Sequence, residues 1–89
     1  MPEEDKAFTD NLIARLNRLE HKLHFYVEEE SYGLRLRAVK GQEHFGAFEI
    51  TVHFSDYKDK ETACREFGFM IMLMISAAKL TNPKAFHNM

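Results

Sequence analysis

Residues 23–39 read LHFYVEEESYGLRLRAV, and apolar side chains alternate with polar ones through both halves of the segment. The alternating apolar positions are Leu23, Phe25, Val27, Leu34, Leu36 and Ala38. A period of two is typical of a β-strand that buries one face. Glu29, Glu30, Ser31 and Gly33 between the halves favour a hairpin loop. The segment therefore predicts two antiparallel strands that share an apolar face.

A third strand is predicted after a turn at residues 40–43, KGQE. Its apolar positions are expected to face the same side as those of the hairpin. They are Phe48, Ile50, Val52 and Phe54, alternating with Ala47, Glu49, Thr51 and His53. Three consecutive strands joined by short loops form an antiparallel sheet with one apolar face.

Amphipathic helices are predicted on both sides of these strands. The first covers residues 3–20, where apolar side chains recur every three or four positions. The second begins near Ser55 or Asp56, either of which can cap it, and ends at about Leu80, before Asn82-Pro83. Its expected core side consists of Ala63, Phe67, Met70, Ile71, Met74 and Ala78.

These elements predict one α+β domain over residues 1–89, in the order α-β-β-β-α, with a frayed tail at 82–89. The three-stranded antiparallel sheet is expected to be covered on one face by the two helices. The longest apolar run, residues 67–78, is shorter than the about 20 residues that span a membrane, so we expect no membrane partner. The single cysteine, Cys64, cannot form an internal disulfide and favours a reducing, cytoplasmic compartment.

The sequence carries no motif that indicates catalysis, a cofactor or a metal. His21 and His24 are three residues apart, but a zinc site needs a third or fourth ligand at a recognisable spacing. Cys64 lies beside the expected core side and is interpreted as a small buried hydrophobic residue. No glycine-rich phosphate loop is present. We therefore expect a protein that is not an enzyme and binds neither cofactor nor metal.

The outward side of the second predicted helix is apolar in the middle. Polar residues occupy its two ends: Lys58, Glu61 and Arg65, then Ser76 and Lys79. The helix should be about 36 Å long, whereas a strand of seven or eight residues spans about 25 Å, so one sheet cannot cover it. A second copy of the chain, a different protein, or the chain's own first helix or tail can cover the apolar part. We predict a homodimer or partner interface at Gly68, Phe69, Met72 and Leu73.

The second face of the predicted sheet is polar. It displays Tyr26, Arg35, Arg37, Glu49 and His53, together with His24 and Thr51. A mixture of charges is typical of a solvated sheet face. The alternative interpretation is a binding surface for a partner or a ligand.

The element order α-β-β-β-α resembles that of the double-stranded RNA-binding domain. The resemblance implies RNA contacts from the first helix, the loop between strands one and two, and the start of the second helix. Here that loop contains Glu28-Glu29-Glu30-Ser31, and residues 57–61 place acids beside lysines. The net charge of −2 also lacks the basic excess of nucleic-acid-binding proteins. The resemblance covers element order only, so it identifies no binding residue.

The sequence therefore predicts a small, non-enzymatic, dimeric module that binds a protein partner and regulates it. Inhibitors and adaptors encoded by phages and mobile elements are proteins of this kind. The alternative is a nucleic-acid-binding domain that uses Lys58, Lys60, Arg35 and Arg37. An enzyme would need a site assembled across a dimer cleft.

Overall fold

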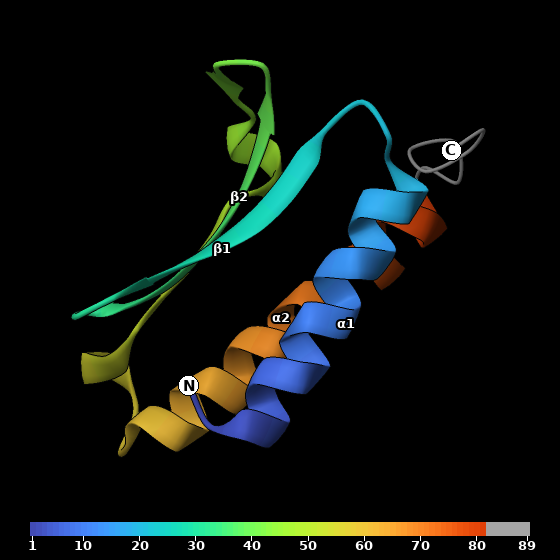
Figure 1. Ribbon diagram of the computed structural model, residues 1–89. Coiled ribbons are helices and arrows are strands. Elements are labelled where there is room, and N and C mark those ends of the chain that lie inside the picture. The colour runs from blue at the N-terminus through green and yellow to red at the C-terminus, as the bar shows by residue number, and fades with distance from the viewer. Residues whose placement is uncertain (82–89) are drawn as a thin grey trace.

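The computed structural model describes the backbone of residues 1–81 and the side chains of residues 1–77, arranged as a sheet with helices on one side (Figure 1). The elements are α1 (Glu3–Leu19), β1 (His24–Glu30), β2 (Gly33–Lys40), β3 (Glu43–His44), the 3₁₀ turn η1 (Gly46–Phe48), β4 (Ile50–His53), the 3₁₀ turn η2 (Phe54–Asp56) and α2 (Lys60–Thr81). The predicted α+β class and helix–sheet–helix order are confirmed. The predicted frayed tail, residues 82–89, lies outside the described residues.

The hairpin of β1 and β2 is longer than the sequence predicted. The register runs from His24 opposite Val39 to Glu30 opposite Gly33, so the loop consists only of Ser31 and Tyr32. Glu29 and Glu30, which were expected in the loop, continue β1. They can do so because backbone pairing with β2 holds them in extended conformation, whatever their side chains prefer.

The predicted third strand is interrupted, and this part of the prediction is wrong. Two short strands take its place on the same side of β2: β3 pairs through Glu43 and His44, and β4 through residues 50–53. Between them η1 closes with a hydrogen bond from the Phe48 N–H to the Phe45 carbonyl, at 3.1 Å. Phe48 still faces the core, where its ring lies edge-on to Phe25 at 5.7 Å between centroids. The turn therefore preserves the inward side chain while it breaks the strand.

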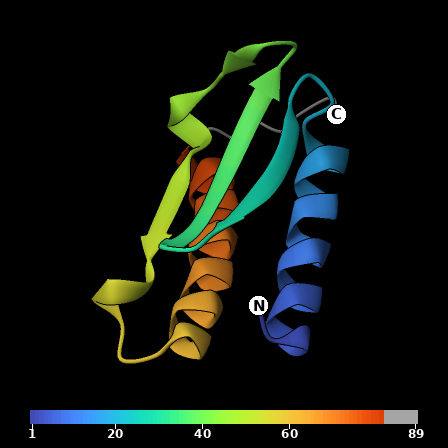
Figure 2. The same cartoon turned by 60° about the vertical axis from the view of Figure 1, so that its left-hand side comes forward.

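The two helices lie side by side on one face of the sheet and run in the same direction, as both views show (Figures 1 and 2). β2 is the central strand, with β1 on one side and β3 and β4 on the other. The opposite sheet face carries no covering element among the described residues. β1 is an edge strand because it pairs only with β2, and α1 lies beside it.

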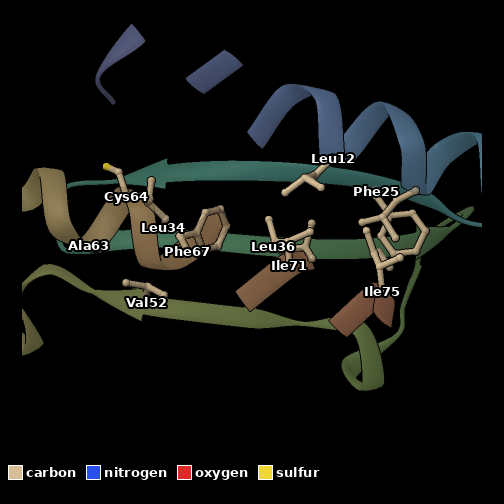
Figure 3. Close-up of a cluster of buried hydrophobic side chains, with 12 residues drawn as sticks. Leu12, Phe25, Leu34, Leu36, Val52, Ala63, Cys64, Phe67, Ile71 and Ile75 are labelled. Atoms are coloured by element: carbon tan, nitrogen blue, oxygen red, sulfur yellow. The ribbon is translucent and has the colours of Figure 1, made fainter. Parts of the chain in front are cut away.

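The core fills the space between the sheet and the helices (Figure 3). Its buried members come from both helices and three strands: Leu12, Leu16, Phe25, Leu34, Leu36, Ala38, Val52, Ala63, Cys64, Phe67, Ile71 and Ile75. The predicted apolar sheet face is confirmed, because Phe48, Ile50 and Phe54 pack against this cluster while half-buried. On α2, Met70 and Met74 were expected in the core but are only partly buried. Cys64 and Ile75 are fully buried instead.

The cap of α2 lies further along the chain than predicted. Ser55 and Asp56 belong to η2, and α2 begins at Lys60. Asp59 is the cap, because its carboxylate accepts a hydrogen bond from the Thr62 N–H at 2.7 Å. This hydrogen bond, with a second from the Thr62 side chain, lowers the pKa of Asp59 below its ordinary value.

A substitution at Gly33 tests how closely β2 and β4 approach each other. It is buried, and a methyl group added there would overlap the carbonyl oxygen of Val52. We predict that Gly33→Ala lowers the free energy of unfolding by about 3 kcal/mol, because backbone rather than a flexible side chain must move. Gly46→Ala is the matched control, since the space around Gly46 is open. Urea denaturation of both variants measures the difference, and equal stability would contradict the β2–β4 register.

The pH dependence of stability in Asp59 variants tests the cap of α2. Its lowered pKa means that the ionised cap stabilises the fold fully above the unfolded-state pKa of about 3.9. This contribution is lost as the pH falls through the folded-state pKa. We predict that Asp59→Ala melts below the wild type at neutral pH and that the difference shrinks in acid. Asp59→Asn keeps a neutral cap, so the difference in melting temperature between it and Asp59→Ala should not change with pH. If the melting temperature of the wild type instead rose further above that of Asp59→Ala in acid, Asp59 would not be the cap.

Candidate interaction surfaces

The outward side of α2 bears the apolar surface that the sequence predicted. Phe69, Met72 and Leu73 are 40%, 38% and 63% exposed and are called here the α2 patch. Their spacing of three and one residues places them on adjoining rows of the helix. Monomeric proteins expose single apolar side chains routinely, but three adjoining large ones form a continuous surface. The patch is therefore a candidate site of protein association.

Gly68, the fourth residue of the predicted interface, is buried inside the molecule. A methyl group at Gly68 would lie 2.8 Å from ring atoms of Phe8, so the glycine lets α1 approach α2 closely. Phe8 in turn packs edge-on against Phe69, with 5.9 Å between ring centroids. Gly68 therefore makes a close helix–helix contact within the chain. α1 covers one flank of Phe69 and leaves the rest of the patch exposed.

The open sheet face holds a ladder of opposite charges. Arg37 lies between Glu28 at 3.5 Å and Glu49 at 3.9 Å, and Arg35 lies 3.6 Å from the same Glu49. The Nε atoms of both arginines are buried and donate no hydrogen bond to any described residue, so Coulomb attraction rather than hydrogen bonding links them to Glu49. The charges of these arginines and glutamates compensate each other. The face consequently offers no free cluster of positive charge to a phosphate backbone.

Aromatic residues lie at the two ends of this face. Tyr26 stacks with His24 at 5.9 Å, and His53 lies 5.5 Å from Tyr32, measured between ring centroids. The structure therefore places Tyr26, Arg35, Arg37 and Glu49 together on one face with His53 at its end, as predicted. The arginines of this face form ion pairs with its glutamates, as is typical of a sheet face exposed to solvent.

A groove that the sequence did not predict lies between α1 and the edge of β1. This edge groove has a volume of about 310 Å³. Residues of both elements line it, together with Met1: Lys6, Thr9, Asp10, Ile13, Asn17, His24, Phe25, Tyr26, Val27 and Glu29. Its existence depends on how far α1 stands from β1, which no local pattern in the sequence encodes.

Asn17 connects the two walls of the edge groove. Its side-chain oxygen accepts the Phe25 N–H at 2.8 Å, and its side-chain nitrogen donates to the Phe25 carbonyl at 3.1 Å. An amide side chain thus satisfies the edge strand as a neighbouring strand would. A polar residue on the half-buried flank of a helix, directly after the buried Leu16, was the available signal in the sequence.

Within the described residues there is no cluster of metal-ligating side chains, and the one cysteine is buried. Among residues 1–77, no three histidine, cysteine or carboxylate side chains lie close enough together to hold a metal ion. Cys64 is buried, and burial raises the pKa of its thiol, which keeps it protonated at neutral pH. The free thiol is therefore a core residue and a poor nucleophile.

Comparison with known proteins assigns the chain to no group. No protein-family model matches it, and no curated protein and no solved structure matches it. Within the described residues, neither helix combines the length and apolar character that crossing a membrane requires.

The burial of Cys64 gives a direct test of this interpretation. We predict that the thiol of the folded protein reacts with a disulfide reagent at least about a hundredfold more slowly than the thiol of the urea-unfolded chain, because the thiolate is both rare and shielded. The chain has one cysteine, so the released chromophore reports this thiol alone. Equal rates in the two states would mean an accessible, activated cysteine.

Proposed function

We propose that this chain is a small, non-enzymatic protein-binding module that acts as a homodimer joined through the α2 patch. The observation that carries the proposal is the exposure of Phe69, Met72 and Leu73 on a helix whose opposite side is already in the core. We also propose a regulatory role of the inhibitor or adaptor type, on the ground of the small size of the chain and the lack of a catalytic motif in its sequence. The single buried thiol favours a reducing, cytoplasmic compartment.

The order of residues along α2 favours a second copy of the chain over an unrelated protein. The row that contains Phe69 and Met72 consists of Glu61, Arg65, Phe69, Met72 and Ser76. In an antiparallel two-fold pairing of α2 with itself, Phe69 meets Met72 and Arg65 meets Ser76. Such a pairing places apolar side chains opposite each other at the centre of the row and polar side chains outside them, as suits a two-fold interface.

The apolar contacts of such a pairing are of the right size for a reversible dimer. Complete burial of a Phe or Met side chain contributes about 1.5–3 kcal/mol, and here part of that surface is already covered. Association costs at least about 4 kcal/mol before any gain appears. Leu73, the most exposed of the three, supplies the further area that a stable dimer needs.

The alternative function, nucleic-acid binding, receives less support. Arg35 and Arg37 face glutamates on their own sheet, so their charges are already compensated. Lys60 lies over the ring of Phe54 at 5.4 Å from its centroid, and Glu61 follows it directly. A duplex would find no uninterrupted row of cations on these elements, and we expect only non-specific affinity, weaker than about 10⁻⁴ M at physiological salt.

The dimer is tested by placing carboxylates on the α2 patch. The double variant Phe69→Glu with Met72→Glu sets like charges opposite each other across the two-fold axis and should be monomeric with an intact sheet. Wild type should sediment as a dimer at micromolar concentration. Sedimentation velocity and far-ultraviolet circular dichroism of the same samples separate dissociation from unfolding.

The matched control adds the same charges elsewhere. Ala7→Glu with Ala14→Glu also introduces two carboxylates, at exposed positions of α1 that the α2 pairing does not use. This variant should remain dimeric. A monomeric wild type, or equal dissociation of both double variants, would refute association through the α2 patch.

A further inference from the structure

The outer edge of β1 has backbone groups that the fold leaves without partners. Alternate residues of an edge strand direct N–H and C=O away from the sheet. Asn17 identifies the outward set, because it binds both groups of Phe25. The period of two places Val27 and Glu29 in the same set. Within the described part of the chain, no hydrogen bond reaches the outward backbone groups of these two residues.

The edge groove lies along these unpaired groups. Ile13 and Val27, which are only partly buried, contribute apolar surface to it. A strand added to the edge would direct every second side chain to the same face as Val27, and therefore into the groove. The rest of the lining is largely polar and includes the Met1 ammonium group, which lies 3.2 Å from the Glu29 carboxylate. The unpaired backbone groups favour an extended chain, and the apolar part of the groove favours apolar side chains on its groove-facing side.

The other side chains of the added strand would meet carboxylates. Glu28 and Glu30 alternate with Val27 and Glu29, so they belong to the open face of the sheet at the same edge. Glu28 lies 3.5 Å from Arg37, whereas Glu30 is exposed and forms no ion pair with another described residue. Opposite charges directly across two strands attract. Lysine or arginine on the open face of the added strand complements this edge.

A second copy of β1 does not fit this edge. Two-fold pairing about Val27 needs the outward groups of Phe25, which Asn17 already occupies. Two-fold pairing about Glu28 or Glu29 sets glutamates directly opposite glutamates, which is destabilising. The occupant is therefore a segment of different sequence.

We propose that the outer edge of β1 binds an extended, basic segment of a partner protein by strand addition. Val27 and Glu29 pair with the backbone of that segment, its apolar side chains enter the edge groove, and its basic side chains face Glu28 and Glu30. This site is separate from the α2 patch and does not depend on the dimer.

The test uses a terminally blocked peptide of alternating valine and lysine, about ten residues long, added to the isotope-labelled full chain. Amide chemical shifts should change in a saturable way at Val27 and Glu29, and exchange of these two amides should slow. The same peptide with alternate backbone amides N-methylated keeps its charge but cannot pair. Its affinity should be at least about tenfold lower, because strand addition rests on main-chain hydrogen bonds.

Two charge reversals locate the basic side chains of the peptide. Glu30→Lys should weaken binding by about threefold or more. Glu43→Lys makes the same change on β3, outside the edge groove, and should leave the affinity unaltered. Three results would overturn the proposal: equal affinity for the methylated peptide, shifts at Phe69 and Leu73 in place of Val27 and Glu29, or no shifts at millimolar peptide.

Discussion

The buried layer between β2 and α2 is the contact on which the rest of the molecule depends. Leu34 and Leu36 of the central strand enter it from one side, and Phe67 and Ile71 of α2 from the other (Figure 3). α2 has 22 residues, about 33 Å, whereas the seven and eight residues of β1 and β2 span about 25 Å. A three-strand-wide sheet with one further helix cannot surround a helix of this length. The α2 patch lies midway along α2 on the side turned away from the sheet, where α1 covers only one flank of Phe69.

The same arrangement explains the other two surfaces. With both helices on one face, the opposite face of the sheet meets solvent, and a ladder of arginines and glutamates neutralises it. α1 lies beside β1 at the sheet edge, where Asn17 closes one end of the strand and leaves Val27 and Glu29 open. We therefore propose two separate surfaces for protein partners on this chain of 89 residues, one apolar and helical and one formed by backbone.

Burial periodicity made much of this fold predictable, and contacts between distant elements account for what was missed. Alternation predicted β1 and β2 because one face of each strand is buried. It could not reveal η1, since Phe48 faces the core whether the backbone is extended or turned. Helical spacing located Phe69, Met72 and Leu73 on the outward side of α2 but put Gly68 with them. Gly68 is buried because Phe8 of α1 packs against it. The sequence around Gly68 does not indicate this contact.

We propose that a second copy of the chain covers the outward side of α2. Isotope-filtered nuclear Overhauser spectroscopy on a mixture of labelled and unlabelled chains tests it most directly, because only contacts between copies give signals. The antiparallel pairing predicts cross-peaks between the Phe69 ring of one copy and the Met72 methyl group of the other, with Leu73 methyl groups nearby. Cross-peaks confined to β1, or none in a sample that diffuses as a monomer, would contradict the account.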